Sequence, residues 1–442
     1  MFAVCEHARQ KMKILVSLPY IPYPLNTGGN QAVFTMLDAM RKEHKLTLAI
    51  RSKPCKDSRD LEKALPGVNI IMLPIRSRLE FPRLGFKGLR FRLIRYIASS
   101  FTRKYLRYIN KHSADDLLSP QTGRRRSPRF IGKNAPPMDD SLYFETVAQI
   151  AVDGHYDLVQ GEFYQNVPLA YYIPKDIKTV FVHHEIMFER LVNEISLFPD
   201  ASVSDEMLAD NERASEVAML SHFDHIITLT QTDKDKLQEL LPSSSIFVSP
   251  AIIKYHSFMD FTPCTNQLVF LGSPSHHPNL DGMLWFCKEI LPLLRDKVAG
   301  LKVHCIGKWD DVSSQLKAQY PELEFPGFIE ETASFMNGKI SIIPIRIGGG
   351  MRMKMLDSIQ AGCPVVGTSK GIEGQDFASG KDCIIADSAE DFAASVLRLL
   401  EDPALQRQLA ENAATTLKAL YNPQKMIQRR LEVYRSIARS LG

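Results

Sequence analysis

The chain has 442 residues, which is more than one hydrophobic core usually holds, and its length predicts two domains of about 200 residues each. Hydrophobic residues make up 45% and charged residues 24%, the proportions of a soluble globular protein. The net charge of +4 is small, so overall charge gives no reason to expect a nucleic-acid partner.

The cysteines are scattered, odd in number and without a Cys-x-x-Cys pair. They are Cys5, Cys55, Cys264, Cys287, Cys305, Cys363 and Cys383. This pattern predicts reduced thiols in a cytoplasmic protein, and neither a disulfide framework nor a zinc site. No apolar run approaches the roughly 18 residues of a membrane-spanning helix. The charged residues of the first eleven positions do not resemble a signal peptide, and we expect residues 1–11 to be an extension outside the fold.

The first half of the chain alternates short apolar runs with helical patterns. Expected strands are Lys13–Leu18, Lys45–Arg51, Ile70–Leu73, Leu158–Gln160, Thr179–His183 and His225–Leu229. A glycine loop at 26–30 follows the first strand and leads into a helix that ends at Met40. The order strand, glycine loop, helix, strand predicts a doubly wound α/β domain over residues 1–252.

A second α/β series follows an irregular connector at 253–266. Expected strands are Gln267–Gly272, Leu301–Gly307, Glu324–Phe325, Ile340–Ile345 and Val365–Thr368, with helices at Leu280–Leu294 and Met351–Ala361. We expect this domain to span 267–424, and a final helix at 425–442 to pack back towards the first domain. Ligands of open α/β sheets bind beyond the carboxyl ends of the strands, so a site is expected between the two halves.

The segment from Gly348 to Asp357 carries the clearest indication of function. Three glycines, Gly348 to Gly350, allow backbone N–H groups to approach a ligand, and the N-terminus of the following helix adds positive partial charge. Arg352 and Lys354 supply full charges, and Asp357 is a hydrogen-bond acceptor for ribose hydroxyls. These residues predict a site for a nucleoside diphosphate that carries a sugar. The alternative is a glycine turn followed by solvated cations.

This segment and several others resemble the donor-binding domain of GT-B glycosyltransferases of group 1, also called glycosyltransferase family 4. The resemblance covers Gln267–Glu373; its matching pieces are Leu268–Ser273, Pro278-Asn279, Leu284–Phe286, Gly327–Ile329 and Gly348–Val366. Lys13–Met40 and Phe181–Glu185 resemble the acceptor domain more loosely. The family has two glutamates eight positions apart at the donor helix, where this chain has Gly349 and Asp357.

The resemblance implies a GT-B fold, two Rossmann-like domains facing each other across a cleft. It also implies sugar transfer from a nucleotide sugar to an acceptor hydroxyl, with retained configuration, no cofactor and no bound metal. His184, Arg352 and Lys354 are the expected catalytic residues. Expected donor contacts are Gly28, Gly29, Gly272, Ser273, Asn279, Ile329, Gly349, Gly350, Met351, Arg352, Lys354 and Asp357.

Several of these residues also have a purely structural interpretation. Gly28 and Gly29 fit a plain strand-to-helix turn, Ile329 fits the core, and His183 could replace His184 as the functional histidine. The triplet Asp233-Lys234-Asp235 resembles a metal-binding Asp-x-Asp, but it follows Thr230 and opens a helix. We therefore interpret it as a capping segment.

A basic segment lies between Arg76 and Lys111, with Glu80 as its single acid. Apolar residues recur there at helical spacing, which predicts a basic amphipathic helix within an insertion at 76–145. Arg92, Arg95, Arg103 and Arg107 are candidates for contact with an anionic membrane surface or an acceptor, where each cation contributes about 1 kcal/mol. The alternative is a core-facing helix with a solvated basic back. Residues 113–140 read as a surface loop.

Together these features predict transfer of a sugar to a glycan or to a glycan on a polyprenyl carrier at the cytoplasmic membrane face. A small soluble acceptor is one alternative, and a catalytically silent GT-B binding partner is another. A dehydrogenase is disfavoured because no Gly-x-Gly-x-x-Gly follows the first strand.

Overall fold

The computed structural model describes residues 11–25, 27–74, 140–199, 201–253, 258–310 and 312–439. The predicted N-terminal extension except Lys11, nearly all of the basic segment with its four arginines, and residues 113–139 lie outside this range. Within it, Ser141 to Glu145, which we placed in the insertion, form the start of a regular helix.

The first half contains a seven-stranded parallel sheet in the order β3-β2-β1-β4-β5-β6-β7. Its strands are β1 (Lys13–Leu18), β2 (Lys45–Ile50), β3 (Asn69–Met72), β4 (Leu158–Glu162), β5 (Lys178–His183), β6 (His225–Thr228) and β7 (Ser245–Val248). The strands are apolar runs because helices cover a parallel sheet on both faces. The order reverses between β1 and β4, which is where doubly wound sheets bind ligands.

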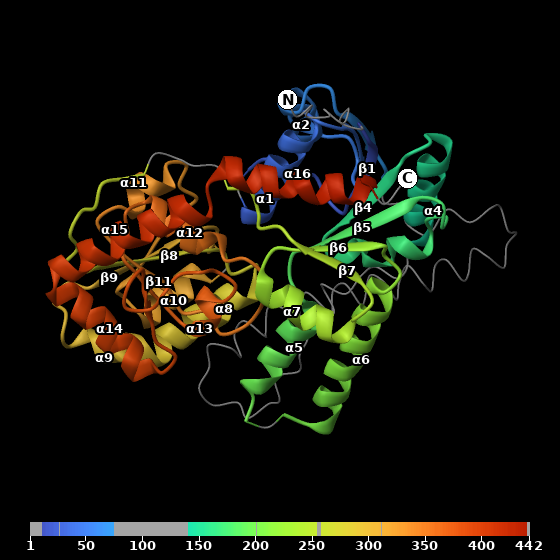
Figure 1. Cartoon of the computed structure of the whole chain (residues 1–442). Helices are drawn as coiled ribbons and strands as arrows, with labels where there is room; N and C mark the ends of the chain where they lie inside the picture. The colour runs from blue at the N-terminus through green and yellow to red at the C-terminus, as the bar shows by residue number, and fades with distance from the viewer. Residues whose placement is uncertain are drawn as a thin grey trace, which may run out of the picture. The chain divides into compact units, whose positions relative to one another are not determined.

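The helices of this half are α1 (Gly28–Met40), α2 (Lys56–Ala64), α4 (Ser141–Asp153), the 3₁₀ helix η2 (Tyr164–Tyr171), α5 (Met187–Ser196), α6 (Val203–Leu220) and α7 (Gln231–Leu240) (Figure 1). The glycine-loop prediction was wrong in one respect: Gly28 and Gly29 are already the first residues of α1. The Thr27 side chain caps this helix by accepting from the Asn30 N–H. The capping interpretation of Asp233 is confirmed, because Thr230 caps α7 and accepts from the Asp233 N–H.

The second half contains a six-stranded parallel sheet in the order β10-β9-β8-β11-β12-β13. Its strands are β8 (Gln267–Leu271), β9 (Lys302–Ile306), β10 (Leu323–Gly327), β11 (Ile340–Ile343), β12 (Val365–Gly367) and β13 (Ile384–Ile385). The order reverses between β8 and β11, so the site-bearing segments after these two strands lie at the switch point.

Helices flank this sheet as well. They are α8 (His277–Trp285), the π-helix η3 (Phe286–Ile290), α9 (Leu291–Arg295), α10 (Ser313–Gln319), α11 (Thr332–Met336), α12 (Met353–Gln360), α13 (Ser369–Ile372), α14 (Ala389–Glu401) and α15 (Pro403–Leu420). The single helix predicted over Leu280–Leu294 is therefore divided. Pro292 has no N–H to donate to the preceding turn, which accounts for the local π geometry before it.

The last helix, α16 (Pro423–Arg439), packs on the first sheet although it follows the second in sequence (Figure 1). The Arg430 guanidinium donates to Ser249, and the Tyr434 hydroxyl donates to the Gln160 side chain. The Arg435 guanidinium pairs with Glu43 at 3.0 Å. These contacts tie the C-terminal helix to β4 and to the segment after β7.

Two strands were missed from the sequence, β7 and β13. Both are short edge strands, with four and two residues, and such runs carry too little periodicity to be recognised. Across the described ranges, no helix is long and apolar enough to span a bilayer. The six cysteines inside those ranges are all free thiols, as predicted.

Candidate active site

The segment between β11 and α12 forms a tight elbow at Gly348–Gly350. Gly348 and Gly350 adopt φ values of +103° and +71°, which disfavour residues with a Cβ. A Cβ on Gly350 would lie 2.1 Å from the His184 carbonyl oxygen, so the close approach itself requires glycine. The elbow is thus built to bring its backbone close to the segment that follows β5.

The helix after the elbow is shorter than predicted. It begins at Met353, and Arg352 is its N-cap residue with φ −86° and ψ 86°, outside helical geometry. The prediction that both cations lie in the first helical turn was therefore wrong for Arg352. Lys354 is in that turn, and Asp357 lies about one turn further along the helix.

Arg352 is buried and fastens the elbow from behind. Its Nη1 donates to the Gly349 carbonyl at 2.8 Å and its Nε to the Lys370 carbonyl at 3.2 Å. Its Nη2 is buried and has no hydrogen-bond partner among the described residues. Burial lowers the pKa of Arg352, and the nearby carboxylates of Glu185 and Glu373 oppose that shift. A guanidinium in this position holds the glycines and keeps one N–H group in reserve.

Lys354 lies between an aromatic ring and an amide. Its Nζ is 4.7 Å from the centre of the Phe270 ring and donates to Asn279 Oδ1 at 2.6 Å. Burial, together with the Arg352 charge, lowers the pKa of Lys354 to about 7. An anion placed beside this ammonium would restore its charge, so the site is suited to a phosphate.

Asp357 occupies the same helix, one turn further on. Burial raises the pKa of its carboxyl to about 7. A carboxyl that titrates near neutrality is easily ionised by a hydrogen bond from a ligand hydroxyl.

Glu185, which the sequence analysis did not single out, occupies the elbow. Its Oε1 accepts from the Gly349 N–H at 3.1 Å, and its Oε2 lies 3.6 Å from Arg190 Nη1. Burial by itself would raise its pKa, but Arg190, other nearby cations and the Gly349 N–H lower it. The elbow therefore already binds a carboxylate of the chain itself. Its position in the quoted run Phe181–Glu185 is the only signal that the sequence offered.

His184 is oriented by a carboxylate and a ring. Its Nε2 lies 2.6 Å from Glu162 Oε2, and its imidazole stacks on Phe163 at 4.1 Å between centroids. Phe163 has a φ of +64°, a strained conformation for a residue with a side chain. His183, the alternative candidate, is buried and bonded at 2.8 Å to Glu216, whose carboxylate also accepts from the Met187 and Phe188 N–H groups. His183 is thus part of the core and His184 faces the elbow.

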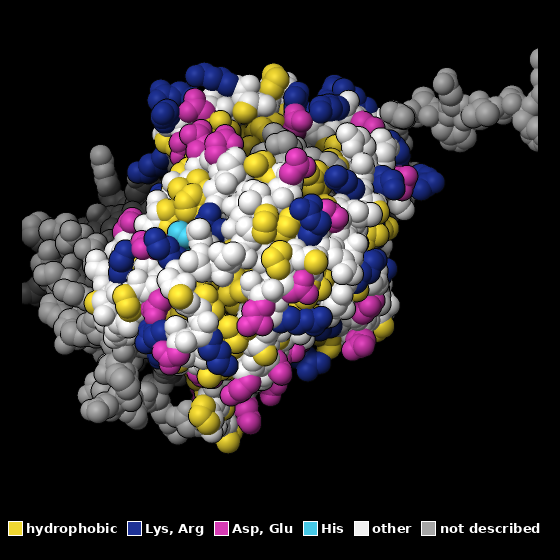
Figure 2. Space-filling model, turned by 90° about the vertical axis from the view of Figure 1, so that its left-hand side faces the viewer, with side chains coloured by type: hydrophobic (Ala, Val, Ile, Leu, Met, Phe, Trp, Pro, Cys, Tyr) yellow, Lys and Arg dark blue, Asp and Glu magenta, His cyan; other side chains and the backbone are white. Residues whose placement is uncertain are grey.

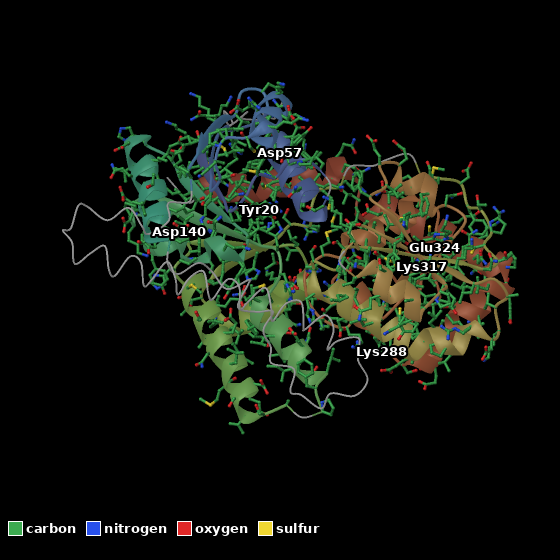
Figure 3. All side chains as sticks on the ribbon, turned by 180° about the vertical axis from the view of Figure 1, so that it is seen from behind. Tyr20, Asp57, Asp140, Lys288, Lys317 and Glu324 are labelled. Carbon is green, nitrogen blue, oxygen red and sulfur yellow. The ribbon has the colours of Figure 1, made fainter. Side chains whose placement is uncertain are left out.

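The glycines of α1 lie against the same region. A Cβ on Gly28 would lie 3.0 Å from Cγ of Met353, the first residue of α12. A Cβ on Gly29 would lie within 3.6 Å of Tyr20 and Phe163 side-chain atoms. Tyr20 follows β1, as Figure 3 shows. The predicted glycines of the two halves are therefore brought close to each other.

Asn279 links the end of β8 to Lys354. Its Nδ2 donates to the Ser273 carbonyl at 2.9 Å while its Oδ1 accepts from Lys354. A Cβ on Gly272 would lie 2.7 Å from Nδ2 of Asn279, so this glycine admits the amide. The Ser273 hydroxyl bonds to the Lys308 carbonyl and to Ser275.

Ile329 and Met351 are less clearly part of the site. The Ile329 side chain packs against the cluster that contains Val269 and Ile306, and its carbonyl accepts from the Thr332 hydroxyl at 2.9 Å. Met351 is partly buried beside the elbow. These contacts explain Ile329 as a core residue and leave its N–H as the group that could face a ligand.

Comparison with known proteins identifies the class. Residues 265–402 match the family model described as Glycosyl transferases group 1. TarM of S. aureus, solved with UDP, fondaparinux and α-GlcNAc-glycerol, aligns over 96% of this chain and 100% of its own, with a TM-score of 0.62 and 9% identity. HepE of Anabaena, solved with UDP-glucose, aligns over 96% of this chain and 100% of its own, with a TM-score of 0.60 and 12% identity. The fold is therefore that of the GT-B glycosyltransferases, as the sequence predicted.

The second half of the chain is a group 1 glycosyltransferase domain, as the resemblance indicated. A curated relative is a Klebsiella pneumoniae protein described as an uncharacterized 44.6 kDa protein in the cps region. It is 24% identical over 294 residues, which cover 63% of this chain and 74% of the relative.

Proposed function

We propose that this protein transfers a sugar from a nucleoside diphosphate sugar to a hydroxyl of a glycan, with retention of anomeric configuration and without a metal ion. The elbow carries this proposal: a glycine N–H already binds a carboxylate, beside a buried guanidinium with a free N–H and an ammonium of lowered pKa. These groups suit a diphosphate better than they suit any neutral ligand.

In this proposal the bond between the anomeric carbon and the β-phosphate oxygen breaks while the acceptor oxygen bonds to that carbon. Negative charge grows on the departing diphosphate, and Lys354, Arg352 and the Gly349 N–H stabilise it more than they stabilise the intact donor. The acceptor hydroxyl gives its proton to the departing phosphate. Asp357 accepts hydrogen bonds from the ribose, and His184 contacts the transferred sugar or the acceptor.

The other predicted donor contacts have supporting roles. Gly28 and Gly29 let the end of α1 approach the diphosphate, and Gly350 admits the His184 backbone. Gly272 and Ser273 position Asn279, which holds Lys354. Met351 and the Ile329 N–H would border the nucleoside.

A polysaccharide or a glycan on a lipid carrier is the acceptor we favour, because the Klebsiella relative comes from a cps region. Arg92, Arg95, Arg103 and Arg107 would meet an anionic membrane surface on its cytoplasmic side. On the face shown in Figure 2, lysine, arginine and acidic side chains are interspersed among the described residues, so that face does not form a uniformly basic surface. Sedimentation with anionic vesicles, before and after the four arginines are replaced by alanine, tests this part. Unchanged sedimentation of the variant would refute it.

Two measurements test the function itself. The first is thermal unfolding in the presence of a panel of UDP-, GDP-, ADP- and dTDP-sugars, in which a donor should raise the melting temperature by mass action. The second is donor turnover by Lys354→Ala, which should fall by about 10²–10³-fold. Lys317→Ala is the control, since Lys317 pairs with Glu324 on the exposed surface of the same half (Figure 3). A folded protein that no nucleotide sugar stabilises would be a silent binding partner or have another function.

A further inference from the structure

A buried polar chain joins the C-terminal helix to His184. The Tyr434 hydroxyl of α16 donates to Gln160 Oε1, and Gln160 Nε2 donates to Glu162 Oε1 at 2.5 Å. The other oxygen of Glu162 lies 2.6 Å from His184 Nε2. Tyr434, Gln160 and Glu162 are each fully buried. A continuous set of hydrogen bonds therefore runs through the protein interior to the edge of the candidate site.

The direction of each hydrogen bond follows from the chemistry of its members. An ionised carboxylate only accepts, so Glu162 receives one hydrogen from Gln160 and one from His184. The Gln160 amide must then present its NH₂ group to Glu162 and its oxygen to Tyr434. His184 consequently carries its proton on Nε2, which leaves Nδ1 unprotonated as an acceptor.

The surroundings of His184 prevent the ring from leaving this arrangement. Phe163 stacks on one face of the imidazole at 4.1 Å and is held there by a strained backbone, with Tyr20 packed on Phe163 at 4.9 Å. A cavity of about 10 Å³ lies beside the dyad and is lined by Glu162, His184 and Arg430 of α16. The C-terminal helix thus forms one wall around the Glu162–His184 dyad in addition to the direct hydrogen bonds.

We propose that Glu162 is the positioning residue of His184, and that Gln160 and Tyr434 hold Glu162 so that His184 presents an unprotonated Nδ1 to the sugar or the acceptor hydroxyl. This inference rests on the proposed function of His184. It assigns α16 a role in the reaction: the far end of the chain determines the tautomer of a residue that touches substrate. Such coupling requires a fully satisfied buried network, because an unpaired member would be costly.

The first test does not depend on activity. With ¹⁵N-labelled histidine, the nitrogen shifts of His184, assigned by comparison with His184→Gln, should show the Nε2–H tautomer in the wild type. They should show mixed tautomers in Glu162→Gln. In that variant the side chain presents an NH₂ group to either Gln160 or His184, so one donor must turn away. Wild-type shifts typical of the Nδ1–H tautomer would overturn the proposal even if sugar transfer is confirmed.

The second test uses turnover with the donor found in the thermal screen. Glu162→Gln should lower kcat about tenfold or more, with little change in the donor KM, because the elbow is untouched. Tyr434→Phe should lower kcat about fivefold, the effect of one hydrogen bond, and Tyr434→His should not restore the rate. Tyr156→Phe is the matched control, since its buried hydroxyl donates to Thr47 at 2.7 Å in the same sheet.

Equal loss of stability in Tyr434→Phe and Tyr156→Phe, with loss of kcat only in the former, would support the proposal. Equal kcat in both variants would overturn it. Absence of transfer by the wild type would refute the proposed function instead, and the histidine shifts would still decide whether Glu162 positions His184.

Discussion

The Glu185 carboxylate accepts a hydrogen bond from the Gly349 N–H at 3.1 Å, across 164 residues of sequence. The same N–H is the group expected to bind the donor diphosphate. Arg190, 3.6 Å from the other oxygen of Glu185, offers the carboxylate a second partner. A donor therefore has to replace an internal anion before it reaches the elbow.

Neutralising Glu185 should strengthen binding of UDP. We expect Glu185→Gln to lower the Kd of UDP about tenfold, because a charged competitor for the N–H is worth about 1.5–3 kcal/mol and the amide competes only weakly. Isothermal titration calorimetry measures this directly. Glu189→Gln is the control, as Glu189 pairs with Lys236 on the neighbouring helix. Weaker binding by Glu185→Gln would mean that Glu185 contacts the donor rather than competing with it.

Binding of UDP should depend on pH through Lys354. Its pKa is about 7, and a bound diphosphate would raise that value, so binding takes up a proton at and above neutrality. The affinity should fall as the pH rises from about 7 to about 9, by at most about tenfold per unit. Titrations in buffers of different ionisation enthalpy report the proton uptake.

Lys354→Arg keeps the positive charge throughout this range, so the proton uptake should disappear in that variant. If the uptake remains unchanged, another group must be responsible, and Asp357, whose pKa is also about 7, is the first to examine with Asp357→Asn.

Asp357 should make the fold less stable as the pH rises towards neutrality. Its pKa is about 7 in the folded chain and 3.8 as the model value, so the stabilising effect of the bound proton is complete below about pH 4 and lost above about pH 7. Asp357→Asn does not titrate. The free energy of unfolding of the variant should therefore gain on that of the wild type by up to about 4 kcal/mol across this window.

Denaturant titrations at several pH values between about 4 and 8 measure this difference. Asp235→Asn on the exposed side of α7 serves as the control. A difference between Asp357→Asn and the wild type that does not change with pH would show that Asp357 is not buried as an acid.

The three glycines of the elbow should differ in their tolerance of a side chain. Gly350→Ala should destabilise the protein by at least about 2 kcal/mol, because φ is +71° and the new Cβ would lie 2.1 Å from the His184 carbonyl. Gly349→Ala should cost less than about 1 kcal/mol, since its Cβ would meet the nearest atom at 3.7 Å. Thermal unfolding of the pair provides an internal control. Equal stability of the two variants would place His184 away from the elbow.

Much of the fold could be predicted because parallel strands buried on both faces are continuous apolar runs, as in Lys13–Leu18, which was predicted to the residue. The candidate elbow could also be found, because glycines, cations and a carboxylate are adjacent in the chain. The start of α12 could not be placed, since Arg352 is a good helix former and only its contacts with Gly349 and Lys370 pull it out of the helix.

The sequence by itself therefore determined two doubly wound domains and the chemistry of one loop, because these depend on residues that are neighbours in the chain. Only the tertiary structure decided which groups meet that loop. The Glu185 carboxylate reaches Gly349 across 164 residues, and Tyr434 reaches Gln160 across 274. Such contacts depend on how helices pack on the sheets, and no local pattern of residues encodes the side chain that will arrive from elsewhere.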